Sequence, residues 1–236
     1  MTESGDTLVG TTIGSYRVMR RLGAGGVGTV YLGEHPHIGR RVAIKVLHDK
    51  YRDDDSVVGR FFDEARAVNR IGHANVVEVL DLAHLPDGRP YVLMEYLAGE
   101  DLAAILKRGP LPAPEAVAIT REVLAALGAA HAEGILHRDI KPANVFRTAD
   151  GRIKLLDFGL AKVMTAESAR TRATAALLGT PAYMPPEQIE GGMLDERTDI
   201  YAVGVMHLHL EHRRGAGVSA LRRAEAAGLT TTSSRA

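Results

Sequence analysis

Four polar side chains stand close together in the middle of the sequence, within two short motifs. Residues 137–144 read His-Arg-Asp-Ile-Lys-Pro-Ala-Asn, and residues 157–159 read Asp-Phe-Gly. The side chains able to do chemistry are Asp139, Lys141, Asn144 and Asp157. Carboxylate and amide oxygens are ligands that Mg²⁺ prefers, and an ammonium group can offset the charge of a phosphate. The combination indicates a site that moves a phosphoryl group with the help of magnesium.

The composition is that of an ordinary globular protein and limits the partners to expect. The 236 residues are 45% apolar and 25% charged, with 29 Lys and Arg against 29 Asp and Glu. Balanced charge gives no overall field toward nucleic acid or an anionic membrane, so neither is expected as a partner. The polar first residues lack the apolar core of a signal peptide, and no run reaches the roughly 18–20 apolar residues of a membrane span. The absence of cysteine excludes disulfides, and we expect a soluble cytoplasmic protein.

A glycine-rich segment lies between two β-like runs near the N-terminus. Residues 23–28 read Gly-Ala-Gly-Gly-Val-Gly, and residues 29–32 read Thr-Val-Tyr-Leu. A dinucleotide-binding fold would continue with a helix, whereas the β-branched and aromatic residues here favour a strand. In a strand–loop–strand hairpin, backbone N–H groups can cover nucleotide phosphates because no side chain obstructs them. A surface hairpin with flexible glycines remains the alternative.

Lys45 interrupts an apolar strand pattern, and an ammonium group that points inward needs an anionic partner. The helical pattern that follows, with Ser56 as its expected N-cap, carries Glu64 on its apolar face. A pair between Lys45 and Glu64 is therefore predicted. The alternatives are a solvent-facing lysine and a Glu64 that pairs with Arg60 or Arg66.

Together these motifs resemble those of the eukaryotic-like, bacterial-type serine/threonine protein kinases, with a catalytic domain truncated at its C-terminal end. The resemblance implies a two-lobed α+β fold, in which a small antiparallel β-sheet with one helix precedes a mostly helical, incomplete lobe. The expected boundaries are a polar N-terminal segment (1–15), a kinase domain (16–206, with lobes of about 16–95 and 98–206) and a disordered tail (207–236).

By this resemblance, the chain would transfer the γ-phosphoryl group of ATP, with Mg²⁺, to serine or threonine hydroxyls of proteins. Asp139 would accept or orient the hydroxyl proton, and Lys141 would face the transferred group. Asn144 and Asp157 would bind the metal ion. His137 would be structural rather than a base.

The same resemblance implies the nucleotide site. Lys45, oriented by Glu64, would hold the α- and β-phosphates and would count with Glu64 among the catalytic residues. Met94 would precede the hinge between the lobes, and Leu156 would line the cavity of the base. The residues expected to contact the nucleotide are Leu22, Gly23, Gly25, Gly28, Val30, Ala43, Lys45, Glu95, Leu97, Phe146 and Asp157.

Residues 157–187 would form an activation segment. Hydroxyls, small residues and bases without apolar periodicity predict a loop there, and Thr174, then Thr171, are the expected phosphorylation sites after self-association of the chain. Arg138 would bind the phosphate group on this segment, and Thr180 would hydrogen-bond to Asp139 and Lys141. A plain solvated loop is the alternative.

The resemblance fails in two places. Pro185-Pro186-Glu187 stands where the family has Ala-Pro-Glu, and no arginine can be assigned as the partner of Glu187. After Met206 the apolar content is too low for the helices that the large lobe still needs. This tail is either the end of a truncated or frame-shifted product, which we favour, or a basic segment that binds a partner. A metal site there is disfavoured, because His207 and His209 face apart on a helix.

Two other functions stay open. An inactive nucleotide-binding fragment or scaffold would keep the same residues, so the motifs do not exclude it. A dinucleotide-dependent oxidoreductase is the second alternative, and a strand after Gly28 would argue against it.

Overall fold

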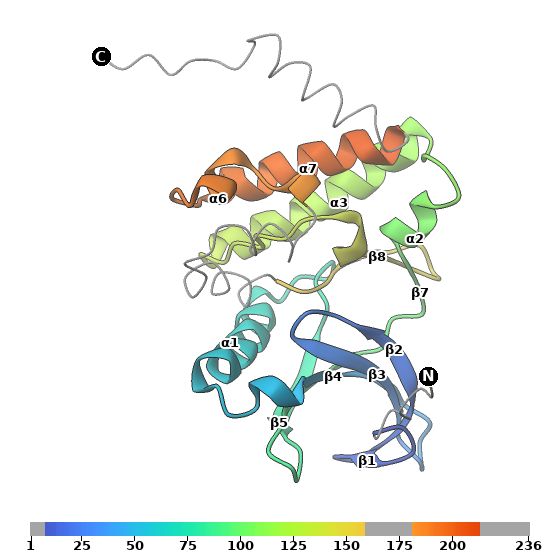
Figure 1. Ribbon diagram of the computed structural model, residues 1–236. Helices are drawn as coiled ribbons and strands as arrows, with labels where there is room; N and C mark the ends of the chain where they lie inside the picture. The colour runs from blue at the N-terminus through green and yellow to red at the C-terminus, as the bar shows by residue number, and fades with distance from the viewer. Residues whose placement is uncertain (1–7, 159–180, 213–236) are drawn as a thin grey trace, which may run out of the picture.

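The computed structural model describes residues 8–158 and 181–212, which form two lobes (Figure 1). The smaller lobe holds a six-stranded antiparallel sheet and one long helix, and the larger lobe is mostly helical. The chain passes from one lobe to the other after strand β6 (Pro90–Glu95). The two-lobed α+β fold expected from the sequence is confirmed.

The sheet of the small lobe has the order β1-β2-β3-β4-β6-β5. Its other strands are β1 (Thr12–Ile13), β2 (Tyr16–Ala24), β3 (Gly28–Glu34), β4 (Arg41–Leu47) and β5 (Val79–His84). The glycine-rich segment is the turn between β2 and β3, so a strand and not a helix follows Gly28. The sheet begins before Tyr16, because β1 pairs with β2, and Leu8 and Ile13 are buried against one face of the sheet beside Val18.

Helix α1 (Asp55–Ile71) covers the other face of this sheet. On this side of the helix, the buried residues Phe61, Phe62 and Ala65 pack against β4 and β6. The expected N-cap at Ser56 is wrong: the Asp54 carboxylate caps the helix by accepting hydrogen bonds from the N–H groups of Ser56 and Val57, both at 3.1 Å. Both residue types cap helices well, and the earlier one satisfies two otherwise unpaired donors.

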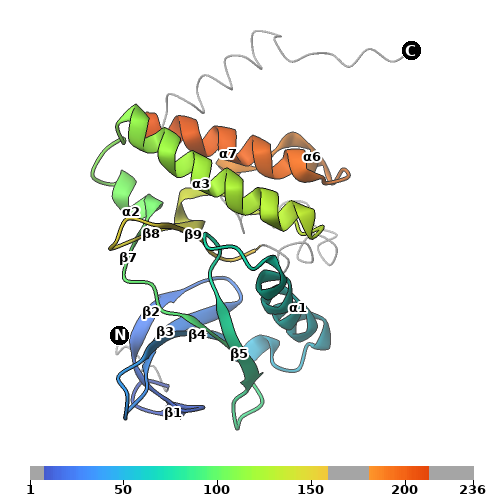
Figure 2. The ribbon, with the colours of Figure 1, turned by 180° about the vertical axis from the view of Figure 1, so that it is seen from behind.

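Two long helices form the centre of the large lobe. Helices α3 (Ala113–Ala132) and α7 (Glu196–Glu211) lie side by side in both views (Figures 1 and 2). The remaining elements are α2 (Leu102–Leu106), α6 (Pro186–Glu190), a sheet of β7 (Gly99–Asp101), β8 (Val145–Thr148) and β9 (Ile153–Leu155), and short 3₁₀ turns at Asp49–Tyr51, Pro142–Asn144 and Pro181–Tyr183. Within the described ranges, no helix combines the length and the apolar character that crossing a membrane requires.

Helix α7 continues past Met206 to Glu211, so the first residues of the tail expected to be disordered (207–236) are helical. The Leu111 N–H donates to the Leu210 carbonyl at 2.7 Å, and Leu210 itself is fully buried. His207 Nδ1 lies within hydrogen-bond distance of Thr120 Oγ1, at 2.9 Å, and His209 forms a hydrogen bond with the Tyr183 hydroxyl. These partners on α3 and before α6 keep the last turn of α7 helical, and they are distant in sequence.

The large lobe has a buried carboxylate at its centre. Asp199, near the start of α7, is 1% exposed and accepts three hydrogen bonds. Its donors are the backbone N–H of His137 at 2.9 Å, the backbone N–H of Arg138 at 2.8 Å and His131 Nε2 at 2.8 Å. A buried charge is tolerated when hydrogen bonds replace its lost hydration. Asp199 thereby ties the 137–144 motif to α7.

His137 is buried and held as a neutral ring. Its Nδ1 accepts from the Asp139 N–H at 3.3 Å, so Nε2 carries the hydrogen and donates to the Leu156 carbonyl at 3.0 Å. The ring packs on Phe158, with ring centres 4.5 Å apart. Burial lowers the pKa of His137, although the nearby carboxylates of Asp199 and Asp139 oppose this effect. The structural role expected for this histidine agrees with these contacts.

Acidification from about pH 7.5 to about pH 5.5 is expected to lower the free energy of unfolding. The pKa of His137 lies below the roughly 6.5 of the unfolded chain, so the unfolded state binds more protons as the pH falls. The loss begins below about pH 6.5 and reaches at most about 1.4 kcal/mol per pH unit for this group. Urea unfolding of the parent and of His137→Gln measures it; an equally steep dependence in the variant would contradict the assignment.

Candidate active site

Lys45 pairs with Glu64 of its own lobe and with Asp157 of the large lobe, so it joins the two lobes. From β4 it lies 2.7 Å from Asp157 Oδ1 and 3.5 Å from Glu64 Oε1, measured from Nζ. Its side chain and that of Glu64 are each 13% exposed, whereas Asp157 is 52% exposed. Burial lowers the pKa of Lys45, but Asp157 and then Glu64 raise it by more, so the net pKa is raised. The Lys45 ammonium in turn holds the pKa of Asp157 below its ordinary value, against the effect of burial.

The alternative partners of Glu64 are engaged elsewhere. Arg60 donates to the Ser56 hydroxyl at 2.5 Å, and Arg66 pairs with Asp63 at 2.9 Å. The cation that faces Glu64 is therefore Lys45, on the strand next to the apolar face of α1.

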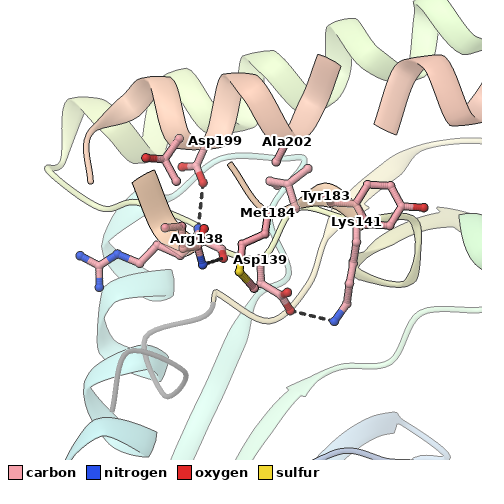
Figure 3. Close-up of a pocket in the computed structure, with 10 residues that line it drawn as sticks. Arg138, Asp139, Lys141, Tyr183, Met184, Asp199 and Ala202 are labelled. Atoms are coloured by element: carbon pink, nitrogen blue, oxygen red, sulfur yellow. Dashed lines mark hydrogen bonds and ion pairs between the residues drawn. The ribbon is translucent and has the colours of Figure 1, made fainter. Parts of the chain in front are cut away.

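The 137–144 motif forms a second cluster. The Asn144 amide group donates to the Asp139 carbonyl at 2.8 Å and to Asp139 Oδ2 at 2.7 Å. Lys141 Nζ lies 2.9 Å from the same carboxylate oxygen, and Figure 3 shows the two side chains facing each other. The cluster therefore places a carboxylate between a cation and an amide.

The two clusters are neighbours. The Leu156 N–H donates to the Asn144 carbonyl at 2.9 Å, which fixes the residue before Asp157 against the motif. The charge of Lys141 also contributes to the lowered pKa of Asp157, after the larger effect of Lys45. Arg138 and Asp157 both have left-handed backbones, with φ of 61° and 44°. Such conformations cost energy for residues other than glycine and persist only where the surroundings hold them.

The three predicted glycines differ in what the fold requires of them. A Cβ on Gly28 would lie 2.5 Å from the Val46 carbonyl oxygen, so the hairpin itself needs glycine there. A Cβ on Gly23 would meet nothing within 4 Å, and on Gly25 it would meet only the Gly28 carbonyl oxygen, at 3.9 Å. Neither residue has a positive φ. The described part of the protein therefore gives no internal reason for glycine at these two positions.

The other residues expected to face the nucleotide lie on the strands and connections around these clusters. Register places Val30 opposite Lys45, and Ala43 opposite Met94, on one face of the sheet. The apolar residues expected to face the nucleotide are Leu22, Val30, Ala43, Leu97 and Phe146. Each of them is at least partly exposed and does not belong to a closed core.

The Glu95 side chain has a role that the sequence did not indicate. It accepts hydrogen bonds from Lys154 Nζ at 2.5 Å and from the Glu78 N–H at 2.9 Å. Lys154 also donates to the Val76 carbonyl at 3.1 Å. The carboxylate thus holds β9 and the segment before β5 together.

Two pockets adjoin the clusters. The first is lined by Lys45, Phe61, Glu64, Met94 and Asp157, among others. The second is shown in Figure 3, and its lining includes Arg138, Asp139, Lys141, Tyr183, Met184 and Gln188. The reactive groups therefore border open space on both sides.

Several expectations lie at or beyond the edge of the described residues. Thr171, Thr174 and Thr180 fall outside them, as does the glycine of the Asp-Phe-Gly motif. Arg138 Nε is buried, with no hydrogen-bond partner in the described ranges. Glu187, for which no arginine partner could be assigned, accepts a hydrogen bond from the Thr198 hydroxyl at 3.2 Å.

The oxygen atoms at the junction of the clusters fit a magnesium ion. Asn144 turns its amide N–H groups toward Asp139, which leaves its carbonyl oxygen for another ligand. Asp157 uses Oδ1 for Lys45, and its side chain is half exposed. Among residues 8–158 and 181–212, no group of three or more His, Cys, Asp or Glu side chains could hold a metal by itself. Mg²⁺ often takes only one or two protein oxygens and completes its shell with water and phosphate.

Comparison with known proteins places the chain in a family. The family model for the protein kinase domain matches residues 16–215. Serine/threonine-protein kinase Pkn1 of Myxococcus xanthus is 49% identical over 212 residues, which are 88% of this chain and 30% of that protein. Serine/threonine-protein kinase PknL of Mycobacterium tuberculosis is 42% identical over 193 residues, which are 81% of this chain and 47% of that protein. The chain thus spans about a third to a half of the length of these relatives.

Solved structures agree with this placement. The crystal structure of the Mycobacterium tuberculosis PknI kinase domain matches with a TM-score of 0.67 and 35% identity, over 85% of this chain and 75% of that one. The chain therefore has the protein kinase fold and belongs to the protein kinase family, beside serine/threonine-protein kinases of bacteria.

Proposed function

We propose that the chain transfers the γ-phosphoryl group of Mg-ATP to serine and threonine hydroxyls of proteins. The observation that carries the proposal is the meeting of two clusters from different lobes. Lys45 and Glu64 come from the small lobe, and Asp157 joins them to the loop that carries Asp139. The names of the bacterial relatives support the choice of serine and threonine as acceptors.

The phosphates would be held from the small lobe. Lys45 would bind the α- and β-phosphates, since its ammonium is already aimed by two carboxylates and carries a raised pKa that keeps it charged. Gly23 and Gly25 would leave room for the phosphates to approach the backbone N–H groups of the turn. Asn144 and Asp157 would hold Mg²⁺, which supplies charge stabilisation to the phosphate oxygens.

The acceptor would be handled from the large lobe. Asp139 would orient the incoming hydroxyl and accept its proton as the new O–P bond forms and the bond from the γ-phosphorus to ADP breaks. Lys141, 2.9 Å from this carboxylate, would offset negative charge on the transferred group. Asn144 would orient the Asp139 carboxylate through its 2.7 Å hydrogen bond. By the same reaction a second copy of the chain would phosphorylate Thr174 or Thr171, and the reaction would take place in the cytoplasm.

Phosphoryl transfer is expected in the parent protein and not in Asp139→Asn. The test incubates purified chain with γ-labelled Mg-ATP and a mixed protein substrate, and follows label in protein with and without EDTA. Loss of the carboxylate is expected to lower the rate by about 10²-fold or more, because the hydroxyl loses the group that orients it and accepts its proton. Label in neither protein would favour the inactive nucleotide-binding fragment, and equal label in both would indicate a contaminant.

Alanine at Gly25 is expected to affect ATP binding, whereas alanine at Gly28 is expected to affect stability. Gly25→Ala leaves the melting temperature nearly unchanged, because its Cβ meets only the Gly28 carbonyl oxygen at 3.9 Å, but weakens ATP binding by crowding the phosphates. Gly28→Ala lowers stability by about 1–3 kcal/mol, because its Cβ collides with the Val46 backbone. Calorimetry gives both the melting temperatures and the dissociation constants for Mg-ATP. Unchanged ATP affinity in a folded Gly25→Ala protein would count against a phosphate site at this turn.

A further inference from the structure

Gln188 lies on helix α6, and the packing of this helix does not explain why a glutamine stands at this position. Helix α6 has five residues, Pro186 to Glu190, and none of them is buried. Its side chains instead reach the rest of the large lobe through polar contacts: Glu187 accepts from Thr198, and Gln188 Nε2 donates to the Arg138 carbonyl at 3.0 Å. Thr198 is the neighbour of Asp199 in α7, so α6 is anchored next to the carboxylate that holds the other side of Arg138.

The Arg138 carbonyl belongs to the peptide group that carries Asp139. The N–H of this peptide donates to His137 Nδ1 at 3.3 Å, and its carbonyl accepts from Gln188. The preceding peptide is held by the Asp199 carboxylate through the Arg138 N–H. Both peptide groups that flank the left-handed residue are therefore fixed by side chains from α6, α7 and the loop itself.

This arrangement matters because Arg138 has a φ of 61°. A residue other than glycine leaves this region unless its surroundings hold it there. Asp199 restrains the N-terminal side of Arg138 and Gln188 restrains the C-terminal side. Without the Gln188 donor, the peptide before Asp139 would gain rotational freedom, which would loosen the contacts of the Asp139 carboxylate with Lys141 and Asn144.

We propose that Gln188 is a positioning residue, which directs the Asp139 carboxylate by holding the peptide group between Arg138 and Asp139. The role rests on the phosphoryl transfer proposed above. Gln188 itself need not touch the transferred group; it acts through the Arg138 carbonyl. Because one hydrogen bond to a neutral acceptor is involved, its loss is expected to lower kcat by about five- to tenfold and to leave the KM for ATP unchanged.

Two variants separate hydrogen bonding from space filling. Gln188→Met keeps the length and approximate volume of the side chain but has no donor, and Gln188→Glu keeps its shape but presents an acceptor to the Arg138 carbonyl. Both are expected to lose kcat, Gln188→Glu by more, whereas Glu190→Met, an exposed change on the same helix, is expected to have no effect. A residue that only fills space would tolerate methionine.

A spectroscopic readout works without catalysis. Arginine labelled with ¹³C at the carbonyl and aspartate labelled with ¹⁵N give one NMR signal for each Arg–Asp peptide, and the sequence has two, at 52–53 and 138–139. The Arg138 carbonyl shift is expected to move in both Gln188 variants, while the Arg52 signal stays and reports an intact fold. An unmoved Arg138 shift, or a moved shift with unchanged kcat, would overturn the proposal. Absence of transfer in the parent would overturn the proposed function instead, and the carbonyl shift would still decide the contact.

Discussion

The structure depends most on the buried carboxylate of Asp199. Removing a carboxylate from water costs several kcal/mol, and here three N–H donors offset that cost. Two of the donors are consecutive backbone groups of the loop that carries Asp139, so the loop has to follow the carboxylate. Because α7 packs along α3, the position of the carboxylate is set by the apolar core of the large lobe. The packing of the apolar core therefore determines the conformation of this polar loop.

From that anchor the contacts lead outward to the small lobe. His137 stacks on Phe158 and donates to the Leu156 carbonyl, and Leu156 donates back to Asn144. These contacts fix both sides of Asp157, whose carboxylate then reaches Lys45 in the other lobe. The charge pairs of the site are partly exposed, so they orient the side chains of the site more than they stabilise the fold. The groups proposed to carry the reaction are thus arranged largely by residues outside the reaction, such as His137, Leu156 and Phe158.

Much of this arrangement could be predicted from the sequence where the pattern was local. The pairing of Lys45 with Glu64 follows from two charges placed on apolar faces, which need each other. The strand after Gly28 follows from β-branched residues. The N-cap of α1 was misplaced because Asp54 and Ser56 are both good caps and only the fold decides between them. The continuation of α7 and the contacts of Gln188 and Glu95 depend on partners far along the chain, and no spacing rule reports those.

The most direct test of the account is native-state hydrogen exchange of the His137 and Arg138 amides in the parent and in Asp199→Asn. Asparagine keeps the shape of aspartate but has one acceptor oxygen in place of two, so it cannot receive both backbone donors in the same way. We predict that both amides of the parent exchange only by global unfolding. We also predict that at least one of them loses about 100-fold or more protection in the variant, beyond the change seen for the Val123 and Leu127 amides of α3. Equal protection of His137 and Arg138 in the two proteins, relative to α3, would contradict it.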